Sequence, residues 1–184
     1  MTDTATDLRT LRQNIYVMRN GILADSLRQN GCPYRLIFGL NLPQLTEIAT
    51  QTGRRADLAL ELWRDTSLRE AALMAPMLYP PEELTLDFAR ERAAAVRWTE
   101  DADILCFKLL RHAPFADRLA DELCDSEAPL SRYTGLRLYF CIVAQHPAEA
   151  LKAAERELAR PEPLSTLAAM LRQEAEFLLE SPTL

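Results

Sequence analysis

The chain has 184 residues, of which 48% are hydrophobic and 26% are charged, and its net charge is −6 at pH 7. This composition is that of a globular protein and excludes an intrinsically disordered chain, and the length suits one domain over residues 1–184. The negative charge argues against a general nucleic-acid binder, because such proteins are usually basic. Any contact with DNA therefore needs a local basic face.

The amino terminus and the cysteines indicate the cellular compartment in which the protein is found. No apolar run approaches the roughly 20 residues that cross a bilayer, and the start, MTDTATDLRT, lacks the apolar stretch of a secretory signal. We therefore expect a cytoplasmic protein with no membrane partner. The four cysteines have no CxxC spacing, which favours free thiols over a metal site or disulfides. They are Cys32, Cys106, Cys124 and Cys141.

The first predicted element is a long helix. Leu, Ala, Glu and Arg dominate the chain and Gly is rare, which favours helix over strand. Apolar residues at three- and four-residue spacing predict a helix from about Thr6 to Arg28. Gly21 is expected to break or bend this helix, and Asn30-Gly31 ends it.

A loop over residues 31–42 follows, and then Asn41 is expected to cap a helix with Gln44 as its reciprocal partner. That helix stops near Gly53, and another covers about 57–64. The stretch from Ser67 to Glu70 is read as a second capping box.

The helix that Ser67 opens is expected to run to about Tyr79. Pro76 is expected to bend this helix or to end its regular part early, because proline removes a donor and clashes with the preceding turn. Pro80-Pro81 stops the helix.

The rest of the chain reads as a succession of helices of 10–16 residues with short connections. Four prolines, Pro114, Pro129, Pro147 and Pro163, each lie just before or at a helix start, where proline is well suited. Such helices pack antiparallel on their neighbours. A series of these pairs predicts an all-α protein, an α-α superhelix of HEAT-like repeats, with an irregular helical bundle as the alternative. The expected ranges are 82–96, 100–112, 115–125, 130–145, 148–159 and 164–179.

Three stretches carry a family resemblance: YRLIFGLNLPQLTEIA (34–49), LALELWRDTSLREAALMAPMLYP (58–80) and WTEDADILCFKLLRHAPFA (98–116). They contain an aromatic-Gly-Leu-x-x-Pro loop, a Leu-Trp-x₅-Arg-Glu joint between helices, and a Trp followed by an Asp at the head of a helix. Together they resemble the AlkD-like DNA alkylation-repair family, HEAT-like repeat glycosylases that excise positively charged alkylpurines. The chain is expected to be a short member that ends a repeat early.

The resemblance implies a partner and a mechanism. The partner is double-stranded DNA held against a basic surface, and neither a metal nor an organic cofactor is required. Asp103 matches the carboxylate that stabilises the positive charge developing on the sugar as the glycosidic bond breaks. Trp98 matches the aromatic residue beside the lesion, and Arg137 matches the arginine that reaches the DNA backbone.

Trp98 and Asp103 are five residues apart, which places them about 140° apart on a continuous helix. If Thr99 is the N-cap, Trp98 lies outside the helix and this constraint disappears. Asp101 is a competing carboxylate. Alternatively, these aspartates are ordinary acidic residues of a first helical turn, where they suit the positive end of the helix dipole.

Arg137 lies in LRLYFCIVA, an otherwise apolar stretch, where a lone charge is costly unless it is paired. It either contacts phosphate or forms an ion pair with Asp103 or Asp101. Several other arginines are candidates for a phosphate-binding surface or are simply solvated. In the predicted DNA-binding set they are Arg35, Arg69, Arg97 and Arg132.

A second hypothesis for the whole chain is a non-catalytic scaffold that binds a protein partner. His112 and His146 are both expected at the carboxyl ends of helices, where a protonated imidazole suits the helix dipole. Neither has a neighbour at metal-ligand spacing, and the chain has no Gly-rich phosphate loop or GxSxG motif.

Overall fold

The computed structural model describes residues 3–180, which divide into two compact units, one ending at Glu83 and the other beginning at Leu84. Within this range every regular element is a helix, and one isolated bridge joins Leu36 to Leu68. The all-α class is confirmed. No helix among these residues combines the length and apolar character that crossing a membrane requires. A single domain over 1–184 stays a prediction.

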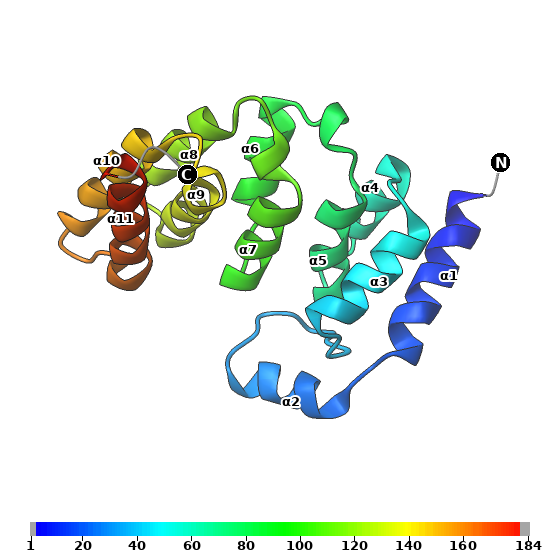
Figure 1. Ribbon diagram of the computed structural model, residues 1–184. Helices are drawn as coiled ribbons and strands as arrows, with labels where there is room; N and C mark the ends of the chain where they lie inside the picture. The colour runs from blue at the N-terminus through cyan, green and yellow to red at the C-terminus, as the bar shows by residue number, and fades with distance from the viewer. Residues whose placement is uncertain (1–2, 181–184) are drawn as a thin grey trace. The chain divides into compact units, whose positions relative to one another are not determined.

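In the amino-terminal unit, α5 is the central helix (Figure 1). It packs against α3 and α4, while α1 packs against the same two helices. Side chains along nearly the whole of α5 are buried, and Pro76 lies inside the helix without ending it. The described elements of this unit are α1 (Thr4–Val17), α2 (Gly21–Gln29), α3 (Leu42–Thr52), α4 (Ala56–Arg64), α5 (Arg69–Leu78) and the 3-10 helix η1 (Pro81–Glu83).

In the carboxy-terminal unit, α9 is central and packs against α7, α8, α10 and α11. Helices α8 and α9, and likewise α10 and α11, form closely packed pairs joined by short loops (Figure 1), which is the HEAT-like arrangement predicted from the sequence. The described elements are α6 (Leu86–Ala94), α7 (Thr99–Lys108), η2 (Leu110–His112), α8 (Ala116–Cys124), α9 (Pro129–Ile142), α10 (Pro147–Leu158) and α11 (Ser165–Glu180).

Gly135 sets the closeness of α8 and α9. A Cβ at this position would lie 2.7 Å from the Cys124 sulfur and 2.8 Å from the Ala120 carbonyl oxygen. A side chain here would force the two helices apart, so the pair depends on glycine. All four cysteines are free thiols, as expected, with Cys106 and Cys124 buried.

The long first helix divides in two. Helix α1 ends at Val17, and α2 begins at Gly21. The side chain of Asn20 accepts a hydrogen bond from the Leu23 N–H and caps α2. The break expected at Gly21 is therefore confirmed, and the glycine is the first residue of the new helix.

One predicted capping box is confirmed and one is wrong. Asn41 and Gln44 exchange the expected reciprocal hydrogen bonds, each 3.0 Å long. Ser67 does not cap α5: its hydroxyl donates to Asp65, and Leu68 occupies the N-cap position without a side-chain hydrogen bond. The reason is that Glu70, the expected partner of Ser67, is used elsewhere, as described below.

Two of the predicted later helices are interrupted. The range 82–96 contains η1 and then α6, which Thr85 caps by accepting from the Phe88 N–H. The range 100–112 contains α7 and then η2. The remaining predicted ranges agree with α8 to α11 to within three residues at each end, a margin at which helix ends are normally uncertain.

Candidate functional site

Helix α7 begins at Thr99, and Trp98 is its N-cap residue, with extended backbone angles of φ −149° and ψ 156°. Thr99 is thus not the N-cap, but Trp98 does lie outside the helix, as that hypothesis required. The carboxylate of Asp101 accepts a hydrogen bond from the Arg97 N–H at 3.2 Å. This hydrogen bond holds the turn that carries Trp98. Asp101 is only 7% exposed, so that of the two aspartates Asp103 is the accessible one.

Asp103 is held by two side chains from α9. The Tyr133 hydroxyl donates a hydrogen bond of 2.9 Å to its Oδ1, and Arg137 Nε lies 2.6 Å from the same oxygen as an ion pair. Tyr133 and Arg137 are one helical turn apart, so that both reach α7 from one face of α9. The ion pair that the sequence allowed between Arg137 and Asp103 is confirmed.

The surroundings of Tyr133 keep its hydroxyl protonated near neutral pH. Burial, and then the hydrogen bond to Asp103, raise the pKa of Tyr133 to about 12, so its hydroxyl stays protonated and donates. The Arg137 guanidinium also lies 5.7 Å from the centre of the Phe140 ring. Both contacts of Asp103 fall on Oδ1, and within residues 3–180 its Oδ2 accepts no hydrogen bond.

This carboxylate is oriented and still accessible. The Asp103 side chain is 36% exposed and that of Arg137 is 28% exposed. A fixed anion with one unused oxygen can stabilise positive charge on a bound molecule without first having to reorganise.

Arg132 does not fit the predicted phosphate contact. It is buried, and its Nε lies 3.0 Å from the Glu157 carboxylate. Its other nitrogens donate to the carbonyl oxygens of Glu127 and Glu162. A buried arginine with these partners joins α9, α10 and the connection to α11, so its role in this structure is architectural.

Arg69 does not fit either. It is buried and donates to the carboxylate of Glu70 and to the Leu40 carbonyl oxygen. Glu70 is fully buried and accepts from the backbone N–H groups of residues 38–40 at 2.9–3.3 Å. The pair therefore fastens the loop before α3 onto α5, because buried N–H groups need an acceptor.

Gly39 completes the same loop. Its φ is +77°, and a Cβ there would lie 2.2 Å from the Asn20 carbonyl oxygen at the start of α2. Only glycine fits this position. Two of the motifs that carried the family resemblance are thus in direct contact: the Arg69-Glu70 pair binds the loop that contains Gly39.

Arg35 and Arg97 are both exposed, Arg35 in the loop after α2 and Arg97 beside Trp98. Their exposure is compatible with phosphate contacts. That role stays a prediction.

The comparison with protein families is decisive for the identity of the chain. The model of a family described as DNA alkylation repair enzyme matches residues 11–178. The chain belongs to this family. No curated protein and no solved structure matches it.

In this member of the DNA alkylation repair family, the sequence analysis did not single out two residues as candidates for the site, Tyr133 and Phe107. Tyr133 lies four residues before Arg137, and that spacing is a signal that could have identified it. Phe107, one turn after Asp103 on α7, is 44% exposed and lies against Arg111, 4.4 Å from guanidinium carbon to ring centre.

Proposed function

We propose that this protein binds double-stranded DNA and promotes the loss of cationic alkylpurines, with Asp103 as the catalytic carboxylate. The observation that carries the proposal is the arrangement of Tyr133 and Arg137 on Oδ1, which orients the carboxylate and leaves Oδ2 unused. The family match supports a DNA substrate.

The proposed reaction is hydrolysis of the bond between C1′ of deoxyribose and the base. A base alkylated on a ring nitrogen carries positive charge and takes the bonding electron pair with it, so it leaves as a neutral molecule. The sugar acquires oxocarbenium character, which the Asp103 anion stabilises. Water then adds to C1′ and releases a proton, which gives an abasic site and the free base.

In this proposal DNA is bound by a small number of individual side chains, since the chain as a whole is acidic. Trp98 contacts the deoxyribose beside the lesion, and Arg137 reaches the backbone phosphate while it orients Asp103. Arg97 and Arg35, both exposed, contact phosphates further away. The four free thiols are compatible with the predicted cytoplasmic location.

The test is release of 7-methyladenine or 7-methylguanine from alkylated duplex DNA. Asp103→Asn removes the negative charge at similar size, so we expect release to fall by about a hundredfold or more. Asp87→Asn is the matched control, because Asp87 is also an aspartate paired with an arginine in the same unit, and it should release base like the wild type.

Absence of base release by the wild type, together with absence of salt-dependent duplex binding at low ionic strength, would overturn the proposal. The helical surface would then be assigned to a protein partner, as in the scaffold hypothesis. Duplex binding by a wild type that releases no base would remove the catalytic part alone.

A further inference from the structure

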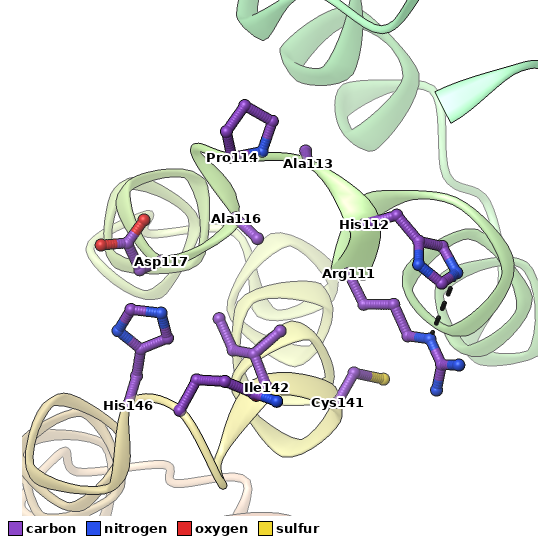
Figure 2. A pocket seen from close by; sticks show the side chains of 10 residues that line it. Arg111, His112, Ala113, Pro114, Ala116, Asp117, Cys141, Ile142 and His146 are labelled. Atoms are coloured by element: carbon purple, nitrogen blue, oxygen red, sulfur yellow. Dashed lines mark hydrogen bonds between the residues drawn. The ribbon is translucent and has the colours of Figure 1, made fainter. Parts of the chain in front are cut away.

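A cavity of about 560 Å³ opens where the carboxyl ends of η2 and α9 meet the amino end of α8 (Figure 2). Arg111 and His112 line one side, and Asp117 and His146 line the other. Cys141 and Ile142 of α9 lie between them. The volume is within the range of small-molecule sites.

Three polar side chains of this cavity, those of Arg111, Asp117 and His146, make few polar contacts within the described residues. Within residues 3–180 no carboxylate pairs with Arg111, whose guanidinium donates only a long hydrogen bond of 3.4 Å to His112. In Figure 2 the Asp117 and His146 side chains lie on the same side of the cavity and point toward each other. Neither side chain makes a hydrogen bond or ion pair within the described range, although Asp117 also suits the positive amino end of α8.

The cavity is therefore bipolar, with a cation at one side and a carboxylate at the other. Apolar groups, among them Pro114 and Ile142, line it as well. Such a site fits a ligand that has an anionic group, a flat apolar body and a hydrogen-bond donor at its far end. It does not suit a metal ion, since the described residues contain no group of three metal-ligating side chains.

The cavity also continues the Asp103 site along α9. Cys141 lies one turn after Arg137 on this helix, a rise of about 6 Å. Burial raises the pKa of the Cys141 thiol, and the nearby charges of Arg137 and Arg111 oppose that rise. These two cations come from different elements, Arg137 from the preceding turn of α9 and Arg111 from η2.

We propose that the cavity binds a nucleotide, with the phosphate at Arg111 and an amino-bearing edge of the base at Asp117. A nucleotide has the required anion, flat apolar ring and donor, and adenine and cytosine carry exocyclic amino groups that a carboxylate can accept from. The nucleotide is either free or an unstacked residue of a DNA strand. The strand-borne case rests on the proposed function.

Calorimetric titration of the whole chain with dAMP, dTMP and inorganic phosphate tests the cavity directly. We expect saturable binding of dAMP in the millimolar range or tighter, and weaker binding of dTMP, because thymine lacks the exocyclic amine. Arg111→Gln should weaken dAMP binding by about tenfold or more, since it removes a charged hydrogen bond to phosphate. Asp117→Ala should bring dAMP and dTMP to within about twofold of each other.

Two variants serve as matched controls. Arg118→Gln changes an exposed arginine that pairs with Glu122, and Glu149→Gln changes an exposed acid in the first turn of α10. Both should bind dAMP as the wild type does, and thermal melting should show that all variants are folded. Absence of dAMP binding to the wild type, or equal binding by folded Arg111→Gln, overturns the proposal.

Duplexes with one bulged adenine test the strand-borne case, because a bulged base is unstacked at little cost. The wild type should prefer the bulged duplex to the paired one, and Arg111→Gln should lose this preference. If the variant loses dAMP binding but keeps the preference, the cavity takes free nucleotides and the strand assignment is overturned. If the wild type binds no duplex, the proposed function fails, while the dAMP titration still decides the nature of the cavity.

Discussion

At the scale of single residues, the contacts of the candidate site converge on one oxygen atom of Asp103. Asp103 Oδ1 receives both the Tyr133 hydroxyl and the Arg137 guanidinium. Two fixed contacts on one oxygen restrict rotation of the carboxylate. In the proposed function Tyr133 is therefore a positioning residue, which works through Asp103.

This role predicts the behaviour of Tyr133→Phe. The change removes the hydroxyl and keeps the ring, and a hydrogen bond to a charged group contributes about 1.5–3 kcal/mol. We expect the single-turnover rate of base release to fall by about tenfold or more while the duplex dissociation constant stays unchanged. A merely structural role would change both quantities together.

Tyr139→Phe is the control for this prediction. Tyr139 lies on the same helix and is fully buried, but its hydroxyl does not contact Asp103. Its base release should match that of the wild type. Equal rates for Tyr133→Phe and the wild type would remove Tyr133 from the site.

At the scale of elements, local patterns predicted helices well where the deciding contacts are local. The reciprocal bonds of Asn41 and Gln44 span three residues, and apolar spacing together with caps placed most of the helices. The capping box predicted between Ser67 and Glu70 was wrong, because the Glu70 carboxylate instead accepts from backbone N–H groups 30–32 residues earlier in the chain. A contact across that separation leaves no periodic signal in the sequence.

The candidate site shows the same limit. The ion pair of Arg137 was among the alternatives because a charge in an apolar helix demands a partner. Tyr133 was missed because its partner is 30 residues away. The buried state of Arg132 and Arg69 was missed for the same reason, since Glu157 and the loop carbonyls become their neighbours only in the folded protein.

Glu70→Gln tests the fastening of the loop before α3. The glutamine side chain carries one NH₂ group, which faces donors where the carboxylate accepted them, and the buried Arg69 loses its counter-charge. Breaking a buried ion pair in this way costs about 3–5 kcal/mol, and we expect the free energy of unfolding in urea to fall by a similar amount.

Glu47→Gln is the control for the loop. Glu47 is exposed on α3 in the same unit, and its contact with Gln51 lies at the surface. The expected change is within about 0.5 kcal/mol. A similarly small change for Glu70→Gln would show that the loop is held by its apolar contacts instead.

At the scale of the whole molecule, the proposed DNA binding has to be reconciled with a net charge of −6. Many of its arginines are neutralised within the protein: Arg90 donates to both oxygens of Glu122, and Arg55 pairs with Asp7 and Asp57. These cations contribute little to an external field. The predicted DNA contacts therefore fall on exposed arginines, among them Arg35 and Arg97. The contribution of each to DNA binding should be separately measurable.

The salt dependence of duplex affinity tests this distribution. Each phosphate neutralised by a cation contributes about 0.9 to the slope of log affinity against log salt concentration. We expect Arg35→Gln and Arg97→Gln each to lower the magnitude of that slope by about 1, and to weaken binding equally for different sequences, since phosphate contacts do not read bases. Arg172→Gln, at an exposed arginine of α11 paired with Glu176, should leave the slope unchanged. An unchanged slope in all three variants would move the DNA-binding surface away from these arginines, and a loss confined to Arg172→Gln would assign it to α11.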